Sequence, residues 1–532
     1  MSSGSTVQRT PAASARRAIA VWMGKATHSG VRRLSSGRGA AIPGRVALAI
    51  DPAALTSLTA EMRRGSILVT GSAGKSTTCQ LLAPIIRAAG LHLVLSTDGS
   101  GQRSALAAAM VAHAAPTGHM RRASPAIGLF EVGSGSLAEI VRHVAGPAAI
   151  VCTNIFPDAI GGQRRRDSGA TALARAIRTL PATTTLILNA DDPGAACLGA
   201  DLPNPRLYFG VSDPACGRVR EDPTSDFPRC PRCDAELTYN RVYYAHLGHW
   251  DCGGCGLSRP RPDVSITRIE QVGSSSARLH LTTPAGPAVL RLPLPGLYNA
   301  YNALAALAAA RHCQLPGRSL AAIEQAPAGS GRMERVTVTG REVYLALGTN
   351  ATGYTEVLRA VLGDGEPKRM LLGLSDRPDA SWIWTVDFES LAGLVPGPVI
   401  TGDGAAKLAV RLKYAGWLGD GQDRGQSAGA IIEPDPVRAF QAAMTATPPG
   451  QPLWVVSTSA ELRAIRRWLR QRGFVQADRR ARGHLTSVQQ PTGPQLTGPQ
   501  PSAPPVSGRR PNGRTRYGRR PPRQAGQTGA GR

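Results

Sequence analysis

The chain has 532 residues, 42% of them hydrophobic, which is enough for about two to four domains with cores of their own. Its formal net charge is +26, but eight basic residues precede the first acid, Asp51, and eleven arginines without an acid lie within residues 479–532. The charge therefore lies mainly in the two terminal segments, which argues against a nucleic-acid-binding core. The sequence contains no run of about 18 apolar residues, so we expect no membrane span.

The N-terminal segment, residues 1–45, is basic and rich in serine, glycine and alanine, and its pattern favours a helix over about residues 12–25. Its apolar piece, Ala18–Met23, is too short for the core of a signal peptide. The nine cysteines fit a reducing compartment, since four form a metal-binding pattern and five are scattered singly. These features predict a cytoplasmic protein.

Short apolar runs alternate with helical patterns through the next region, residues 46–330. The first run, Ser66–Val69, enters a glycine-rich turn that leads into a helix over Ser76–Ala89. Further runs lie at Leu91–Leu95, Ile127–Glu131, Ala149–Thr153 and Thr185–Asn189, and helices are expected at Ser136–His143 and Gly169–Leu180. The alternation predicts an α/β domain with a parallel, doubly wound sheet.

A cysteine-rich insertion at residues 228–260 interrupts this pattern. After it we expect strands at Val264–Ile269, Ala277–Leu281 and Ala288–Leu292 and an alanine-rich helix at Tyr298–His312. A second α/β domain is predicted over residues 331–478, with strands near Val343–Leu347, Met370–Leu374, Val399–Thr401 and Leu453–Val456. Residues 479–532 are rich in Pro, Gly, Gln and Arg, and this composition predicts a disordered tail.

A phosphate-binding loop is predicted where the first strand meets its helix, in the sequence TGSAGKST. Gly71 and Gly74 would let backbone N–H groups close around phosphates at the amino end of a helix. Lys75 could pair with the β- and γ-phosphates of ATP, and the hydroxyl of Ser76 or Thr77 could reach a magnesium ion. The alternative is an ordinary glycine-rich turn, but the strand before it and the helix after it favour nucleotide binding.

Four cysteines form two CxxC pairs, Cys230 with Cys233 and Cys252 with Cys255, and 18 residues separate the pairs. Two such pairs supply four thiolates in a tetrahedron, which suits a structural zinc ion and leaves no position open for catalysis. The alternative of two disulfides is disfavoured in a reducing cytoplasm. Because zinc ribbons also occur in nucleic-acid-binding proteins, the cluster alone does not assign a function.

The phosphate loop resembles that of the Mur ligases, which join amino acids to cell-wall precursors, and further motifs of that family follow in order. The segment NADD resembles the part that borders the nucleotide, GLYNAYNALAA matches a helix start of the form GxxNxxNALAA, and GRME matches the GRxE that opens the C-terminal domain. Taken alone, the two asparagines of the helix start would be interpreted as capping residues. The resemblance implies ATP- or magnesium-binding roles for Glu131, Asn189, Asp191, Asp192, Asn299, Asn302 and Arg332.

Two features resemble the MurT proteins in particular, which are subunits of lipid II isoglutaminyl synthase. One is a zinc ribbon inside the ATP-binding domain, and the other is the pair of C-terminal segments Asp379–Glu389 and Arg411–Gly416. This resemblance implies a heterodimer with a GatD-like glutaminase that supplies ammonia. It also implies ATP-dependent phosphorylation of the α-carboxylate of D-glutamate in lipid II, after which ammonia displaces the phosphate and leaves D-isoglutamine.

In MurT proteins an aspartate of the C-terminal domain completes the Cys–His pair of the glutaminase, and Asp379 matches it by position, with Asp376 as the second choice. The carboxylate would orient the histidine and stabilise its charged form. The alternative is that Asp379 is an ordinary loop or helix-cap residue.

The chain departs from the MurT pattern at several charged positions. The sequence after Glu131 reads Val-Gly-Ser in place of an acidic segment, Asn154–Gly162 lacks charged groups expected beside the metal and the substrate, and Thr349 replaces a lysine. Arg164–Arg166 could supply compensating charge. Because phosphoryl transfer depends on electrostatics, two hypotheses follow: an active but divergent MurT, or a weakened paralogue that acts as a partner or regulatory subunit.

The arginine-rich tail allows a further interpretation, since Arg509–Arg520 with Tyr517 could form an arm for nucleic acid or for the anionic inner face of the membrane. A solvated tail without a partner is the alternative. A zinc-ribbon, nucleic-acid-binding ATPase is therefore a third hypothesis, but the asparagine and GRME motifs have no role in it. We expect lipid II or a related peptidoglycan precursor as a partner, and we do not expect nucleic acid. An arm on the anionic face of the membrane would place this cytoplasmic protein peripherally at the membrane.

Overall fold

The structure is a computed structural model that describes residues 11–34, 41–97, 102–121, 125–156, 169–217, 229–272, 276–315, 319–325, 332–363, 365–377, 379–418 and 429–475. The chain divides into two units, Met1–Gln476 and Ala477–Arg532. The predicted tail, residues 479–532, lies outside the described residues. None of the helices in the described ranges is both long and apolar enough to cross a membrane.

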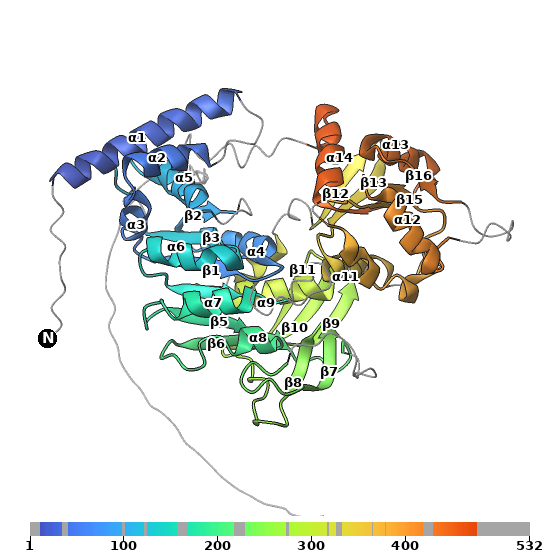
Figure 1. Cartoon of the computed structure of the whole chain (residues 1–532), viewed down its shortest axis with the longest axis horizontal. Helices are drawn as coiled ribbons and strands as arrows, with labels where there is room; N and C mark the ends of the chain where they lie inside the picture. Colours follow the sequence, from blue (N-terminus) through green and yellow to red (C-terminus); the bar gives the residue numbers. More distant parts are fainter. Residues whose placement is uncertain are drawn as a thin grey trace, which may run out of the picture. The chain divides into compact units, whose positions relative to one another are not determined.

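The larger sheet has nine strands in the order β11-β10-β9-β6-β5-β4-β1-β3-β2 (Figure 1). Neighbouring strands from β2 through to β9 in this order are parallel, whereas β9, β10 and β11 form antiparallel pairs. The strands are β1 (Ser66–Thr70), β2 (His92–Ser96), β3 (Ala126–Glu131), β4 (Ala149–Cys152), β5 (Thr185–Asn189), β6 (Arg206–Val211), β9 (Val264–Val272), β10 (Ser276–Thr283) and β11 (Gly286–Leu292). The predicted parallel sheet is confirmed, while β6 was not predicted from the sequence.

Alternate residues of the central strands face two different layers of helices. On one face, Ile67 and Val69 share a core with α4 (Lys75–Ala88), α9 (Leu297–His312) and α10 (Ser319–Glu324). On the other face, Leu68 shares a core with α1 (Pro11–Leu34), α2 (Ile42–Ile50), α3 (Ala54–Thr59), α5 (Arg103–His113), α6 (Leu137–His143), α7 (Gly169–Ile177) and α8 (Pro193–Ala196). A parallel strand covered on both faces is apolar throughout, which explains the continuous apolar runs in the sequence.

The N-terminal helix α1 packs onto this domain and extends beyond the predicted helix at both ends. Its residues Ala20 and Val21 are fully buried in the same core cluster as α2 and α5. Gly24 permits the close approach, because a Cβ at this position would lie 2.8 Å from Val111 of α5. The predicted boundary between the N-terminal segment and the domain falls within α2, so the two share one core.

The smaller sheet has six strands in the order β12-β13-β17-β14-β15-β16, with β12 antiparallel to β13 and the other neighbours parallel. The strands are β12 (Arg332–Val338), β13 (Arg341–Leu347), β14 (Arg369–Gly373), β15 (Val399–Thr401), β16 (Ile431–Ile432) and β17 (Leu453–Ser457). Helices α11 (Ala351–Leu362) and α12 (Ala405–Tyr414) cover one face, and α13 (Pro436–Ala446) and α14 (Ser459–Gln471) cover the other. The predicted strands are present as β13, β14, β15 and β17, whereas β12 and β16 were not predicted.

Candidate nucleotide site and metal centre

The phosphate-binding loop connects β1 to α4, and two of its glycines have positive φ angles. Gly71 has a φ of 130°, and a Cβ there would lie 2.3 Å from Thr153 Oγ1. Gly74 has a φ of 85°, and a Cβ there would lie 2.1 Å from Asn302 Oδ1 on α9. Only glycine fits at either place, so the loop is in direct contact with the end of β4 and with α9.

Lys75 is the first residue of α4, and its ammonium group lies within the turn of the loop. Its Nζ donates hydrogen bonds to the carbonyl oxygens of Gly71 at 2.7 Å and of Ser72 at 3.3 Å. The amino end of α4 adds a partial positive charge at the same place, which favours an anion. To pair with a phosphate, the ammonium group has only to exchange these carbonyl oxygens for phosphate oxygens.

Two residues at the end of β4 hold the other side of the loop. Asn154 accepts a hydrogen bond from Ala73 N at 2.8 Å on Oδ1 and another from Ser72 N at 2.9 Å on its carbonyl oxygen. Thr153 Oγ1 donates to Ala73 O at 2.6 Å. No contact of Thr153 or Asn154 with the loop was predicted. Their position directly after a buried parallel strand places them at the same edge of the sheet as the loop.

Ser76 and Glu131 face each other at the carboxyl ends of β1 and β3, where Ser76 Oγ lies 2.8 Å from both carboxylate oxygens. The Glu131 side chain is buried. Thr77 is also buried, and its hydroxyl has no hydrogen-bond partner among the described residues. A hydroxyl and a carboxylate placed together are oxygen donors of the kind that magnesium binds, so this pair fits the predicted metal role.

The NADD segment follows β5, and its polar side chains contact protein groups. Asn189 Nδ2 donates to Thr153 O at 2.9 Å, and its Oδ1 accepts from Asp191 N at 3.0 Å. Asp192 Oδ2 accepts from Ile155 N at 2.6 Å, and its other oxygen caps α8. Asn189 and Asp192 therefore fix the backbone that follows β4, beside the phosphate loop.

Asp191 is fully buried, and it accepts hydrogen bonds from Tyr301 OH at 2.6 Å and from Val211 N at 2.7 Å. Arg259 forms an ion pair with the same carboxylate. Burial raises the pKa of Asp191, and the charge of Arg259 opposes that rise. A buried carboxylate needs such compensation. In this structure Asp191 joins its segment to α9 and to the chain that follows the cysteine cluster.

The two asparagines of α9 have different surroundings, although both are buried. Asn299 Nδ2 donates to Pro295 O at 2.7 Å, which fixes the turn before the helix. Asn302 Nδ2 lies 3.3 Å from Asn299 Oδ1, and the Asn302 side chain faces Gly74 in the phosphate loop. Asn302 therefore contacts the loop, and Asn299 holds Asn302 in place.

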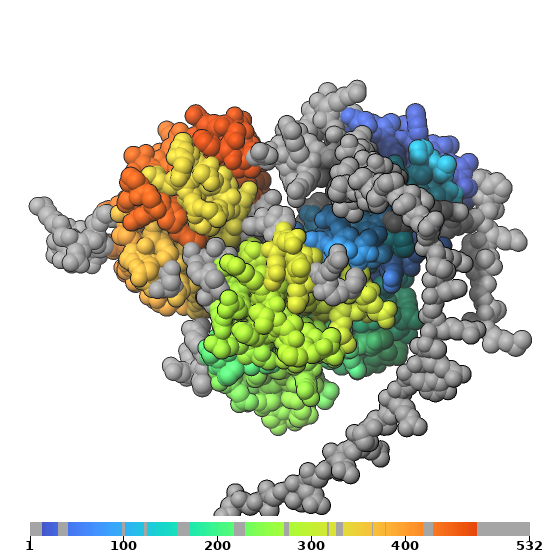
Figure 2. All heavy atoms as spheres, turned by 180° about the vertical axis from the view of Figure 1, so that it is seen from behind, coloured from blue at the N-terminus to red at the C-terminus, as the bar shows by residue number. Residues whose placement is uncertain are grey.

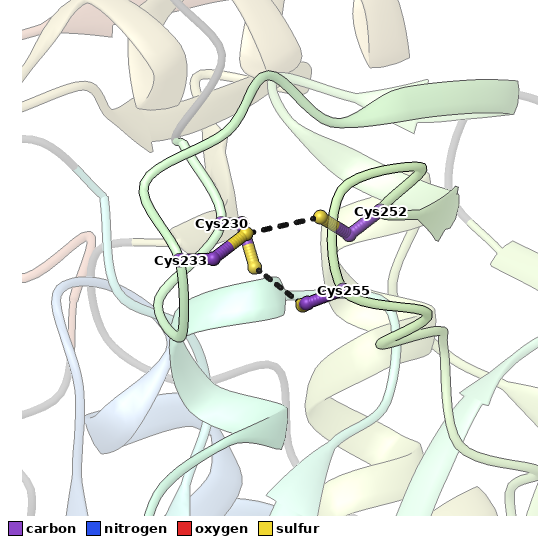
Figure 3. Close-up of side chains that lie close together, drawn as sticks. All are labelled: Cys230, Cys233, Cys252 and Cys255. Carbon is purple, nitrogen blue, oxygen red and sulfur yellow. Dashed lines mark hydrogen bonds between the residues drawn. The ribbon is translucent and has the colours of Figure 1, made fainter.

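The sulfurs of Cys230, Cys233, Cys252 and Cys255 all lie within 4.8 Å of one another (Figure 3). Those of Cys230 and Cys255 are 3.7 Å apart, and those of Cys233 and Cys252 are 3.5 Å apart. Sulfurs bound to zinc at about 2.3 Å in a tetrahedron lie about 3.8 Å apart. The four thiols therefore fit a zinc ion and could hold a metal.

The two CxxC pairs form matching turns. Asp234 N donates to Cys230 O and Gly256 N donates to Cys252 O, both at 2.9 Å, and these two donors have φ angles of 57° and 70°. Burial acts to raise the pKa of the Cys252 thiol, but hydrogen bonds from Cys233 and from backbone N–H groups outweigh it and lower that pKa. The backbone N–H of Ala235 acts to lower the pKa of the Cys233 thiol, but hydrogen bonds within the cluster raise it. Cys252 is therefore the more readily ionised of these two thiols, and the thiolate is the form that binds a metal.

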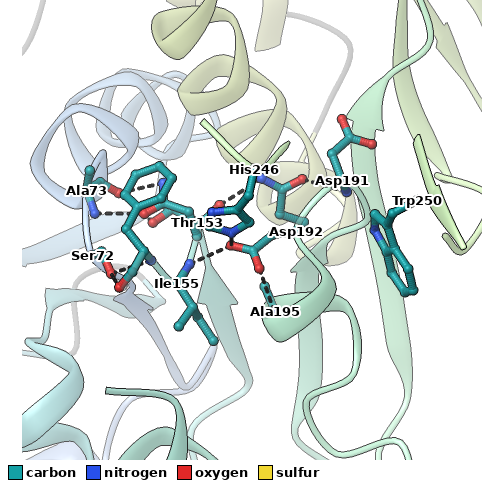
Figure 4. Close-up of polar contacts among 12 residues, drawn as sticks. Ser72, Ala73, Thr153, Ile155, Asp191, Asp192, Ala195, His246 and Trp250 are labelled. Atoms are coloured by element: carbon teal, nitrogen blue, oxygen red, sulfur yellow. Dashed lines mark hydrogen bonds and ion pairs between the residues drawn. The ribbon is translucent and has the colours of Figure 1, made fainter. Parts of the chain in front are cut away.

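The chain between the two pairs forms a hairpin of β7 (Thr238–Tyr244) and β8 (Leu247–Asp251), which was not predicted. The hairpin contacts the NADD segment (Figure 4). Trp250 Nε1 donates to Ala190 O at 3.0 Å, Gly248 N donates to Asp191 O at 2.9 Å, and His246 Nε2 lies 3.4 Å from Asp192 Oδ2. The last contact lacks hydrogen-bond geometry, so it is an ion pair only when the imidazole is protonated.

The model of the Mur ligase middle domain matches residues 69–222, and the model of the MurT ligase C-terminal domain matches residues 347–459. The MurT subunit of lipid II isoglutaminyl synthase (glutamine-hydrolyzing) from Streptococcus pneumoniae is 28% identical over 400 residues, which cover 74% of this chain and 86% of that protein. The subunit of the same name from Staphylococcus aureus strain N315 is 27% identical over 389 residues, 71% of this chain and 83% of that protein. The chain belongs to the MurT branch of the Mur ligase family.

Among solved structures, a pseudomurein peptide ligase type C from Methanothermus fervidus has the same fold. It superimposes with a TM-score of 0.56 at 20% identity and covers 77% of this chain and 79% of that chain. The predicted Mur-ligase-type α/β fold is thereby confirmed. Membership of this family supports an ATP-dependent ligase.

In this MurT-family chain, Asp379 is exposed and lies just before the short helix η2 (Ser381–Thr385). Its two carboxylate oxygens accept hydrogen bonds from Ser381 N and Ser381 Oγ, both at 2.9 Å. These bonds, with the charge of Lys407, lower the pKa of Asp379. Asp376 instead pairs with Lys407 at 2.7 Å. Asp379 is therefore ionised and accessible, although its contacts are also those of a helix-cap residue.

The rest of this MurT-type motif is anchored in the domain. Phe388 is fully buried. Asp387 pairs with Arg359 of α11 at 2.7 Å, and Arg411 of α12 pairs with Glu389 at 2.8 Å. The two MurT-type segments thus form one cluster that holds the Asp379 loop on α11 and α12.

Some predicted positions lie outside the described residues. These are Asp158, Arg164–Arg166 and Gly331, and for Arg332 only the backbone of β12 is described.

Proposed function

We propose that the chain is the ATP-using subunit of a lipid II isoglutaminyl synthase, which converts the D-glutamate α-carboxylate of lipid II to D-isoglutamine. The observation that carries the proposal is the pair of Ser76 and Glu131 beside the phosphate loop, in a chain whose C-terminal region matches the MurT model. ATP and magnesium would be the cofactors of the reaction, and zinc a structural ion.

The chemistry requires the carboxylate to be activated before ammonia can react with it. A carboxylate oxygen attacks the γ-phosphorus of ATP, the bond from that phosphorus to the bridging oxygen breaks, and ADP leaves. Ammonia then adds to the acyl carbon and loses a proton, and inorganic phosphate leaves as the amide forms. In this chain Lys75 would stabilise the charge that develops on the phosphates.

Ser76 and Glu131 would hold the magnesium ion, which supplies further neutralisation of phosphate charge. Gly71 and Gly74 would present backbone N–H groups to the phosphates, and no other residue fits there. Asn302 would keep the loop in the binding conformation through its contact with Gly74.

A GatD-like glutaminase would supply ammonia by binding the C-terminal domain around Asp379. Three exposed apolar residues lie on the same elements, Trp384 of η2 and Val410 and Tyr414 of α12, and we call them the C-terminal patch. The rings of Trp384 and Tyr414 are 6.3 Å apart. Charges of both signs border the patch, including Asp379 and Lys407, and an aromatic centre with a mixed polar rim is typical of a protein interface.

One observation favours a second candidate, a weakened paralogue that serves as a regulatory subunit. Ser134, at the start of the short helix η1 (Ser134–Ser136), stands where related sequences are acidic, three residues after Glu131. The described part of the site therefore offers Glu131 without a following acid. Fewer carboxylates would weaken magnesium binding and slow phosphoryl transfer.

The test is amidation of lipid II by this chain with a purified glutaminase, ATP, magnesium and glutamine, followed by mass spectrometry of the stem peptide. We expect product with the wild type and with Lys368→Ala, a control remote from the loop, and none with Lys75→Ala. If the two proteins bind each other but form no product, and ATP hydrolysis does not depend on lipid II, the regulatory candidate replaces the enzyme.

A further inference from the structure

Among the described residues, two groups account for most of the large apolar side chains that are exposed. One is the C-terminal patch. The other lies on α1 and the start of α2, and we call it the N-terminal patch: Ile19, Trp22, Met23 and Ile42, which are 56%, 60%, 38% and 39% exposed. Exposed apolar groups of this size mark a contact surface.

The orientation of α1 places three residues of the N-terminal patch on one face of the helix. Ile19, Trp22 and Met23 are three and four residues apart, so they lie on one side of the helix. Ala20 and Val21 on the opposite side are fully buried. In Figure 1, α1 lies outside α2 and α5, and Figure 2 shows atoms of α1, in deep blue, at the surface.

A buried ion pair fixes this orientation. Arg17, on the inward side of α1, is 3% exposed, and its Nη2 lies 3.4 Å from Glu61 Oε1. His119 contacts the same carboxylate oxygen at 2.9 Å. Rotation of α1 that turned the apolar face inward would carry Arg17 outward, away from Glu61, and would take Ala20 and Val21 out of the core, and both changes are unfavourable. Trp22 therefore stays on the outside.

Charge identifies the occupant of this face. Residues 1–50 contain no acid, and Arg16 and Arg45 are exposed on α1 and α2 near the apolar residues. The C-terminal patch, by contrast, has acids and bases around it, among them Asp379 and Glu389. A surface helix with Trp and aliphatic residues on its outer face and only basic charges is the composition that binds anionic lipid headgroups.

We propose that α1 docks on an anionic lipid surface, with the N-terminal patch inserted at headgroup level and the exposed arginines on lipid phosphates. The inference stands apart from the proposed function, because docking requires neither nucleotide nor lipid II. If both hold, docking would bring the nucleotide-binding domain to the surface where a lipid-linked substrate lies.

The test is cosedimentation of the full chain with vesicles of equal parts phosphatidylcholine and phosphatidylglycerol, and with vesicles of phosphatidylcholine alone. We expect binding to the anionic vesicles. We expect Ile19→Ser combined with Trp22→Ser to lower that binding about tenfold or more, because two large apolar groups no longer insert. Trp384→Ser, which removes the exposed tryptophan of the C-terminal patch, is the matched control and should bind as the wild type does.

A second measurement separates insertion from attraction by the basic tail. Lipids brominated in the acyl chain should quench part of the tryptophan fluorescence of the wild type, and less of that of Trp22→Phe. Equal binding and equal quenching in wild type and variants would overturn the proposal and assign the binding to the tail. A wild-type dimer that the double substitution converts to monomer, with vesicle binding unchanged, would assign the face to a second copy of the chain.

Discussion

Gly74 shows how tightly single residues define the nucleotide site. Its φ of 85° is rare for any residue with a side chain, and a Cβ there would lie 2.1 Å from Asn302 Oδ1. The strain of a left-handed conformation is roughly 1–2 kcal/mol. The clash adds to it, because Asn302 is itself held by Asn299. Loop and helix α9 therefore cannot adjust independently.

We expect Gly74→Ala to lower the affinity for ATP at least about tenfold, since strain and clash both displace the phosphate-binding N–H groups. Gly135→Ala is the matched control, because a Cβ at Gly135 meets nothing within 4 Å and its φ is not in the positive range. Calorimetric titration with a non-hydrolysable ATP analogue measures both. Equal affinities for the two variants would contradict a nucleotide role for the loop.

Asp379 allows a prediction that separates the release of ammonia from glutamine from the ATP-dependent amidation that uses this ammonia. Replacement by asparagine keeps its shape but removes the charge that would orient the histidine of the glutaminase. We expect Asp379→Asn to lower glutamine-dependent amidation by about a thousandfold or more and to leave amidation with ammonium salts intact. Asp376→Asn, beside Lys407, serves as the control. Equal losses with both nitrogen sources would place Asp379 elsewhere in the mechanism.

The pH dependence follows from the same carboxylate. Hydrogen bonds from Ser381 lower the pKa of Asp379, so the group is ionised at neutral pH and loses its charge only as the pH falls through the lowered pKa. We therefore expect that Asp379 gives no loss of glutamine-dependent activity between about pH 6 and 8. The measurement is the rate of amidation with glutamine and with ammonium salts at each pH. The ratio of the two rates isolates the contribution of Asp379.

At the scale of elements, the hairpin of β7 and β8 connects the four-cysteine cluster to the candidate nucleotide site. The cysteine turns lie at its base, and its tip and second strand contact Ala190, Asp191 and Asp192. Asp192 in turn binds Ile155 N, beside the residues that hold the phosphate loop. Small ribbons depend on their metal for folding. Loss of zinc should therefore loosen the edge of the nucleotide site.

We expect Cys233→Ser to lower zinc content and also to weaken ATP binding several-fold, although no cysteine would touch the nucleotide. His246→Ala should keep zinc and give a smaller loss, since it removes one contact of the hairpin. Cys313→Ser, at a half-buried cysteine remote from the cluster, is the control. A zinc-free but folded variant that binds ATP as the wild type does would show that hairpin and site are uncoupled.

The elements that could be predicted from the sequence are those buried on both faces. Strand β5 was predicted at its observed bounds, because each of its residues is buried. Strand β12 was missed because its sequence, RMERVTV, lies at the edge of its sheet, has no continuous apolar run, and two adjacent charged residues interrupt its alternation. Likewise, the phosphate loop and the two CxxC pairs could be predicted, because phosphate binding and zinc binding use residues that lie close together in the sequence. The contact of Trp250 with Ala190 spans 60 positions and has no local signal.

At the scale of the whole molecule, charge and apolar surface are distributed unevenly. The eleven arginines of residues 479–532 belong to the second unit of the chain, whereas both sheets belong to the first. Each basic residue near an anionic surface contributes about 1 kcal/mol, and this attraction is screened within about 8 Å at physiological salt. The N-terminal patch would add an apolar contribution that salt does not screen. The two contributions therefore differ in their salt dependence.

Deletion of residues 479–532 tests this difference. We expect the shortened chain to lose most of its binding to polyanions such as heparin and to bind anionic vesicles less tightly at low salt. Its remaining vesicle binding should fall less steeply with salt, because fewer ion contacts are released and the apolar contact of α1 persists. ATP affinity should be unchanged, since the loop and α9 lie in the other unit. A shortened chain that no longer binds anionic vesicles at any salt concentration would mean that the tail alone reaches the membrane, and would contradict the docking of α1.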